Sequence, residues 1–150
     1  MNSFQYPMET ILNYRKEKEE IVKQQFSQIQ KQYFLEEKFL KNLEEKLENV
    51  IKAYLHGEKR LIDSIELKNI QQYINFLRKK IDVQKQIVVK IQEKLEQKHQ
   101  QVLFAQRDRK IIEKHKEKAL EKYKLELNYH EQKIIDELAL YTCRKNKWMI

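Results

Sequence analysis

Four histidines and one cysteine are the side chains of this sequence that could bind a metal. No two of the histidines, at positions 56, 99, 115 and 130, stand four residues apart, as a helical zinc site requires. Cys143 is the only cysteine, so an internal disulfide and a cysteine-based zinc site are both excluded. A single thiol also fits a reducing compartment. We therefore expect no metal and no cofactor.

Enzyme chemistry based on phosphate loops or on paired carboxylates is not favoured either. The 150 residues include one glycine, Gly57, whereas nucleotide-binding loops need several. Carboxylates are abundant, but a pair of long helices offers them no interior cleft in which a catalytic pair could form. We predict that the chain is not an enzyme. Where an ATPase is involved, this chain would be its partner.

A basic stretch in the second half raises nucleic acid binding as an alternative. Residues 76–150 carry 19 Lys and Arg against 11 Asp and Glu, whereas residues 1–75 carry 12 of each. The excess is a feature of solvated lysine-rich helices, or it attracts an acidic partner. Acidic residues interrupt the stretch, and no aromatic cluster accompanies its basic residues, which are Arg107, Arg109, Lys110, Lys114, Lys116 and Lys118. We expect no nucleic acid partner, and salt-dependent DNA binding would contradict this.

The elements that would position these residues are two long helices. Apolar residues recur at alternating spacings of four and three, which keeps one seam facing a partner helix in a left-handed coiled coil. The first series is Met8, Leu12, Arg15, Glu19, Val22, Phe26, Ile29, Tyr33, Glu36, Leu40, Leu43, Leu47, Val50 and Tyr54. The second is Ile70, Ile74, Leu77, Ile81, Gln84, Val88, Ile91, Leu95, Lys98, Val102, Ala105, Arg109 and Ile112.

The boundaries of these helices are marked by few residues. Gly57 is placed to end the first helix, and Asp63 with Glu66 is typical of a capping box that opens the second. Pro7 lies near the start of the first helix, where its missing N–H costs little. We predict a single coiled-coil domain over residues 1–150, with a helix over about 5–56, a turn over about 57–63, a helix over about 64–143 and a short C-terminal tail.

A short turn makes the two helices antiparallel neighbours, so the predicted fold class is all-α, an antiparallel coiled-coil hairpin. Polar residues within the seam could fix its register, as a single buried polar residue does in other coiled coils. The predicted pairs are Tyr54 with Ile70, Leu47 with Leu77, Leu43 with Ile81, Glu36 with Val88, Ile29 with Leu95, Phe26 with Lys98, Leu12 with Ile112 and Met8 with Lys116.

The second helix is predicted to extend past the first. At about 1.5 Å per residue, it approaches 120 Å, while the first reaches about 75–80 Å. Beyond about Leu120 the seam continues with little partner surface, through Leu127, Ile134, Leu138 and Tyr141. Such a stripe favours coverage by another protein. The alternatives are that the first few residues of the chain fold over it, or that the end frays.

Two segments of the sequence resemble the FliJ family, the small coiled-coil proteins of the flagellar type III export apparatus. The stretch Asn69–Ile81 is similar to the family's Tyr-Gln-Gln-Phe-Ile…Leu-Glu-x-x-Ile pattern, and Glu131–Ala139 is similar to its Glu-x-Lys-x-x-Asp-Glu-x-Ala ending. The overall size also agrees, as does a first helix that ends in tyrosine, with Leu43, Leu47 and Tyr54 in its last turns.

The resemblance implies two contact sites. In the family, the end that carries both termini inserts into the hexameric ring of the export ATPase FliI. The candidate ring residues here are Lys116, Tyr123, Leu127, Ile134, Asp136, Glu137 and Leu138. The family binds the export-gate protein FlhA through a stripe just after the turn, which corresponds here to Tyr73, Leu77, Lys80 and Gln84. Lys80 and Gln84 stand where the family pattern has a small residue and a histidine.

The resemblance also implies partners and a location. The partners would be the FliI hexamer, FlhA and substrate chaperones, bound by a monomeric stalk similar to the γ subunit of rotary ATP synthases. No apolar run is long enough to insert into a membrane. We therefore expect a cytoplasmic protein, peripheral to the inner membrane at the flagellar base. The equivalent stalk of a virulence secretion system, or an unrelated coiled-coil adaptor, remains open.

Overall fold

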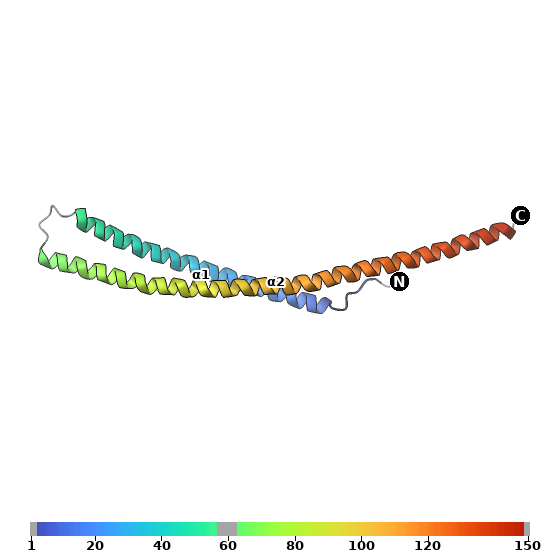
Figure 1. The fold of residues 1–150 in the computed structure, drawn as a ribbon, viewed down its shortest axis with the longest axis horizontal. Coiled ribbons are helices and arrows are strands. Elements are labelled where there is room, and N and C mark those ends of the chain that lie inside the picture. The colour runs from blue at the N-terminus through green and yellow to red at the C-terminus, as the bar shows by residue number, and fades with distance from the viewer. Residues whose placement is uncertain (1–2, 57–62, 149–150) are drawn as a thin grey trace. The chain divides into compact units, whose positions relative to one another are not determined.

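The computed structural model describes residues 3–56 and 63–148, and all regular structure in these residues is helical. Helix α1 spans Glu9–His56 and helix α2 spans Ser64–Trp148 (Figure 1). Buried apolar residues of one helix pack against those of the other. This arrangement confirms the predicted all-α helical hairpin. Gly57, expected to cap α1, lies outside the described residues.

Helix α1 begins later than the sequence predicted. The N–H of Leu12 donates to the carbonyl of Met8 at 3.0 Å, which makes Met8 the residue that caps the helix. Before it, the N–H of Glu9 donates to the carbonyl of Tyr6 at 3.2 Å and closes a turn around Pro7. The helix therefore starts at Glu9 and not near residue 5, because the chain turns at Pro7 before it enters the first helical turn.

Helix α2 begins where the sequence predicted and ends later. The carbonyl of Asp63 accepts the N–H of Leu67 at 3.0 Å, the first hydrogen bond of the helix, so Asp63 is its N-cap residue. The helix continues to Trp148 and not only to about residue 143. Lys145 and Lys147 occupy its last turn, where positive charge interacts favourably with the helix dipole.

Contacts divide the chain into two units, and both helices contribute to each. Unit 2 is Glu20–Phe104, and unit 1 consists of Met1–Glu19 with Ala105–Ile150. In unit 2, Leu43, Leu77 and Ile81 form a buried cluster, and the partly buried residues packed against it are Leu40, Leu47 and Val50. This is the clustering that the predicted register requires. The single domain predicted from the sequence stays a prediction.

Unit 1 has its own core, which includes a residue from outside both helices. Tyr6, Leu12 and Ile112 are buried together. The pairing of Leu12 with Ile112 agrees with the predicted register. Met8, predicted to lie in the seam, is 40% exposed, and Tyr6 takes the buried place. The helical period does not extend to Met8, because the chain leaves the helix direction at Pro7.

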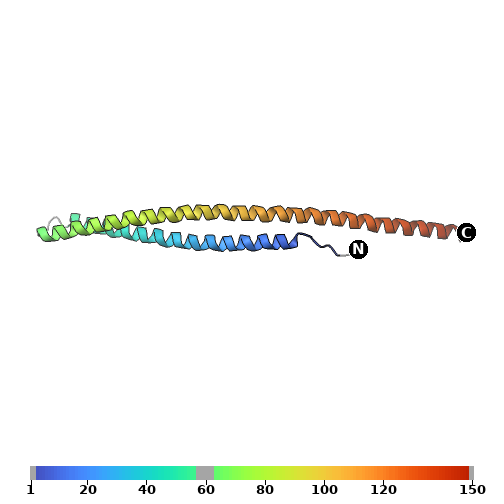
Figure 2. The same cartoon turned by 90° about the horizontal axis from the view of Figure 1, so that it is seen from below.

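The last part of α2 has no second helix beside it in unit 1 (Figure 2). Every described residue from Asn128 to Trp148 is exposed. Ile134, Leu138 and Tyr141, which continue the seam, are 49%, 60% and 66% exposed. The sequence predicted an apolar stripe with little partner surface here, and the structure agrees for the residues it describes.

Candidate functional site

The first candidate surface lies on α2 in unit 2, a few turns after the helix begins. Tyr73 and Phe76 are 44% and 50% exposed, and their rings stack with centroids 6.5 Å apart. The Lys80 ammonium lies 4.7 Å from the centroid of the Phe76 ring. This cation–π contact holds a positive charge over an exposed aromatic face. Tyr73, Phe76 and Lys80 therefore form one continuous surface, which we call the aromatic surface.

The other two residues expected at this surface, Leu77 and Gln84, lie inside the seam. Leu77 is 2% exposed and packs with Leu43 and Ile81. Gln84 is 4% exposed, and its Nε2 donates to the carbonyl and the carboxylate of Glu36 at 3.0 and 2.5 Å. Both occupy positions of the seam period, so α1 covers them. A docking partner can therefore reach Tyr73 and Lys80 but not these two.

The sequence reasoning missed the contribution of α1 to this region. Phe39 from α1 and Phe76 and Val83 from α2 line an apolar hollow of about 360 Å³, together with Lys79, Lys80 and Gln84. Phe76 and Val83 are seven residues apart, so they stand on the same face of α2. Phe39 immediately precedes a seam residue, Leu40. The signal in the sequence was that large apolar residues stand directly beside seam residues, which indicates an apolar surface at the edge of the seam.

The second candidate surface, in unit 1, has two parts. Lys116, Tyr123 and Leu127 are partly buried, while the other expected residues of this surface, Ile134, Asp136, Glu137 and Leu138, are exposed on the stretch of α2 without a partner helix. Within that stretch Gln132 Nε2 donates to Asp136 at 3.0 Å, an i,i+4 contact that supports the helix. The structure therefore places the expected residues along one helix in two different surroundings.

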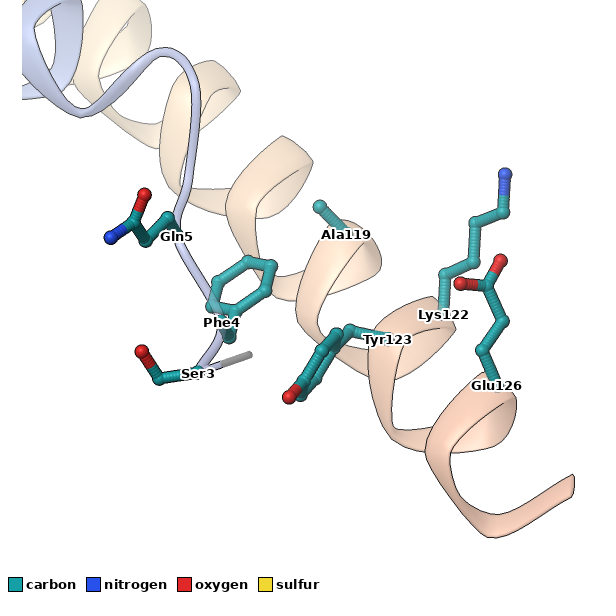
Figure 3. Close-up of a pocket in the computed structure, with 7 residues that line it drawn as sticks. All are labelled: Ser3, Phe4, Gln5, Ala119, Lys122, Tyr123 and Glu126. Atoms are coloured by element: carbon teal, nitrogen blue, oxygen red, sulfur yellow. The ribbon is translucent and has the colours of Figure 1, made fainter. Parts of the chain in front are cut away.

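Residues 3–8, which we call the N-terminal strap, lie against this partly buried part at Lys116 and Tyr123. The Tyr6 hydroxyl is hydrogen-bonded to His115 Nδ1 at 2.6 Å, and Tyr6 is 7% exposed. Phe4 points towards the turn of α2 that carries Tyr123, with the two ring centroids 5.4 Å apart (Figure 3). The Lys116 ammonium pairs with the carboxylate of Glu9 at 2.8 Å, just after the strap.

A hollow of about 510 Å³ lies between the strap and α2 (Figure 3). The side chain of Phe4 reaches into this region from the strap, next to Ala119 and Tyr123 of the helix. The residues that line the hollow are Ser3, Phe4, Gln5, Ala119, Lys122, Tyr123 and Glu126. The strap is therefore fixed tightly at Tyr6 and packed less completely at Phe4.

Polar residues of the seam in unit 1 form an ion-pair network. The guanidinium of Arg109 pairs with the buried carboxylate of Glu19 and with Glu113, whose Oε2 lies 2.7 Å from Nη1. The hydrogen bonds that Arg109 donates to Glu19 and then to Glu113 raise the pKa of its guanidinium, which stays charged at any physiological pH. Arg15 donates to the carbonyl of Asp108 at 2.7 Å. Two charged residues of the seam, Glu19 and Arg109, thus pair with each other.

These contacts bear on the basic stretch. Two of its positive side chains, Arg109 and Lys116, are engaged by carboxylates of α1. Fewer cations of the stretch therefore remain available to a polyanion than the sequence alone indicates. In the described residues, no group of three or more His, Cys, Asp or Glu side chains is arranged to hold a metal ion. Nor does any described helix contain a stretch long and apolar enough to cross a membrane.

Comparison with known proteins gives one match. The family model described as Flagellar FliJ protein matches residues 4–147 of the 150-residue chain. The match therefore includes both candidate surfaces, helix α1, and all but the first residue of the strap and the last residue of helix α2. No curated protein matches the chain, and no solved structure matches it either.

Proposed function

Because the chain belongs to the FliJ family of flagellar proteins, we propose that it acts in flagellar protein export as a non-catalytic stalk that binds the export ATPase ring and the export gate. The observation that carries the proposal is the stretch of α2 from Asn128 to Trp148, where apolar side chains stand exposed on a single helix. Exposed apolar stripes of this kind mark surfaces that other proteins cover.

The ATPase contact is proposed for unit 1. Ile134 and Leu138 are about half exposed and lie one helical turn apart on α2, so a partner can grip both at once. Asp136 and Glu137 stand between them and add acidic charge to the same stretch. A ring of ATPase subunits around this stretch would bury apolar area that now faces water.

The gate contact is proposed for the aromatic surface of unit 2. Tyr73 and Phe76 offer two stacked rings, and Lys80 holds a positive charge beside them. Aromatic residues dominate the binding energy of many protein interfaces. Leu77 supports the surface from beneath, through its packing in the seam, and does not touch the gate.

The location of the protein and its partners are also proposed from its membership of the FliJ family. We propose that the protein works on the cytoplasmic side of the inner membrane at the flagellar base, with FliI, FlhA and substrate chaperones as partners. The family match favours the flagellar system over the virulence secretion system. In this role the chain would bring export components together, and the chemistry of ATP hydrolysis would belong to the ATPase.

Binding to the two purified partners tests the proposal. Leu138→Glu puts a charge on the exposed stripe and should weaken binding to the export ATPase at least about ten-fold. Phe76→Ala removes a ring of the aromatic surface and should weaken binding to the cytoplasmic part of the gate protein by a similar factor. Isothermal titration calorimetry with each partner measures both effects.

Each variant has a matched control on the same helix or of the same residue type. Ile65→Glu introduces the same charge at a residue that is 66% exposed on α2 in unit 2, outside the proposed ring contact, and should leave ATPase binding unchanged. Phe34→Ala removes a ring that is 59% exposed on α1, outside the aromatic surface, and should leave gate binding unchanged. If the wild-type chain binds neither partner, the proposed function is wrong.

A further inference from the structure

The N-terminal strap lies on the same stripe of α2 that the ring is proposed to bind. Along α2 this stripe runs through Lys116, Ala119, Tyr123 and Leu127 before it reaches the exposed residues beyond Asn128. Phe4 and Ala119 both pack against the cluster of Tyr6, Leu12 and Ile112. The strap precedes Glu9, the first residue of α1, and thus covers the part of the stripe that α1 itself does not reach.

The two aromatic residues of the strap are held differently. Tyr6 is almost fully buried, its hydroxyl is hydrogen-bonded to His115, and the Lys116 ammonium lies 6.0 Å from its ring centroid. Phe4 is partly buried, makes one ring contact with Tyr123, and lines two hollows, the one of about 510 Å³ and a second of about 420 Å³, whereas Tyr6 lines only the second of these. Incomplete packing forfeits dispersion energy. The Phe4 end of the strap is therefore the weaker end.

From this asymmetry we propose that the strap is an autoinhibitory cap, in which Tyr6 is the fixed anchor and Phe4 is a latch that the ATPase ring must displace from Ala119 and Tyr123. The inference rests on the proposed function, because it describes how the ring site is regulated. Binding then has two steps, release of Phe4 and occupation of the freed stripe by the partner. Until the ring arrives, the strap covers the stripe around Ala119 and Tyr123, while the residues beyond Asn128 stay exposed.

The fraction of molecules in which the strap is released sets how much the strap lowers the affinity for the ATPase. When only a fraction of molecules is open, the apparent affinity for the partner falls by that fraction. If the cap is open in about one molecule in ten, removal of the latch tightens binding about ten-fold. Phe4→Ala removes the latch and leaves the Tyr6 anchor in place. A locked cap has the opposite effect.

The experiment measures binding of purified export ATPase, assembled with a non-hydrolysable ATP analogue, to the full chain and its variants. Phe4→Ala should bind about five- to ten-fold tighter than wild type. A locked variant is Phe4→Cys with Ala119→Cys in a Cys143→Ser background, closed by a short bismaleimide cross-linker, and it should bind at least ten-fold more weakly than the same protein before cross-linking. Circular dichroism checks that each variant keeps its helix content.

Phe34→Ala removes the same side chain outside the strap and should match wild type. An unchanged or weaker affinity of Phe4→Ala, in a protein whose wild-type form binds the ring, would overturn the cap, since a weaker affinity would make Phe4 part of the contact. Equal binding before and after cross-linking would overturn it as well. Failure of every form to bind the ATPase overturns the proposed function and the cap together, and is thereby distinct from failure of the cap alone.

Discussion

The buried clusters of the two units contain different kinds of side chains. In unit 2, the buried cluster around Leu43, Leu77 and Ile81 is entirely aliphatic. In unit 1, the cluster of Tyr6, Leu12 and Ile112 includes a phenol, and an ion-pair network and a tyrosine–histidine hydrogen bond adjoin it. An aliphatic seam gains stability from burial, whereas charged and hydrogen-bonded groups must find particular partners. The buried cluster of unit 1 therefore depends on particular residue pairs, whereas unit 2 has such a pair outside its cluster, between Gln84 and Glu36.

The difference suits the work proposed for each unit. Aliphatic packing in unit 2 supports an exposed aromatic surface from beneath, through Leu77. In unit 1 the polar contacts fix the strap and the start of α1 against α2, at the place where coverage by α1 ends. Three substitutions test this comparison, because each removes one kind of contact.

The largest effect is expected in the aliphatic seam. Leu77→Ala should lower the free energy of unfolding by about 3 kcal/mol, because Leu77 is 2% exposed and its truncation leaves a cavity between the helices. Urea denaturation followed by circular dichroism measures the change. Leu125→Ala truncates a leucine that is 70% exposed and should change the free energy by less than about 0.5 kcal/mol. Equal effects at the two positions would contradict the buried cluster.

A smaller effect is expected in the ion-pair network. Arg109→Met should cost about 2 kcal/mol, because it leaves the buried Glu19 carboxylate without its guanidinium partner. Arg109→Met combined with Glu19→Leu removes both charges and should recover most of the loss. Chemical denaturation of wild type, the two single variants Arg109→Met and Glu19→Leu, and the double variant measures this as a double-mutant cycle. If the double variant is less stable than Arg109→Met, the pair is not the source of the effect.

The smallest effect is expected at the anchor of the strap. Tyr6→Phe keeps the ring in its cluster and removes the hydroxyl that is bonded to His115, so it should cost about 1 kcal/mol. Amide hydrogen exchange should become faster at Gln5–Glu9 and remain unchanged near Leu43 in unit 2. Uniform acceleration in both units would argue against a local anchor.

Much of the fold could be predicted from the sequence, because one spacing rule governs both helices. Each predicted seam residue between Leu12 and Tyr54, and each between Ile70 and Ile112, is buried or partly buried. The prediction that Met8 lies in the seam was wrong, because the spacing period holds only within a helix and α1 begins after Met8. Tyr6 was missed for the same reason, although two aromatic residues on either side of Gln5, just before Pro7, were a signal of packing outside the helix.

The polar pairs of the seam were harder to predict than its positions. The period places Glu36 opposite Val88, but Gln84, one helical turn away, is its partner. It places Lys98 opposite Phe26, yet the lysine Nζ reaches Gln25 at 2.7 Å, and Phe26 packs beside His99. Long polar side chains reach neighbours up to a turn away. Which turn they choose depends on rotamers that a spacing rule does not contain.

The candidate surfaces were predicted in part. Spacing alone cannot tell a docking residue from a seam residue, so Leu77 and Gln84 were assigned to a surface that α1 covers. Tyr73, Lys80, Ile134 and Leu138 are exposed and accessible to a partner, as a docking role requires. Phe39 and Phe76 were not predicted, because the family resemblance assigned neither of them to a contact site. Side chains beside the seam become visible only when the two helices are placed together.

The single-helix stretch from Asn128 to Trp148 sets a limit on how tightly it can be held. Most helical stability in proteins comes from packing of an apolar face, which this stretch lacks, so its backbone should open and close more readily than the paired helices. A protein that grips it must then use part of its contact energy to keep the helix wound. The affinity of the partner for this stretch is therefore lower and its dissociation is faster, which suits a contact that forms and breaks many times.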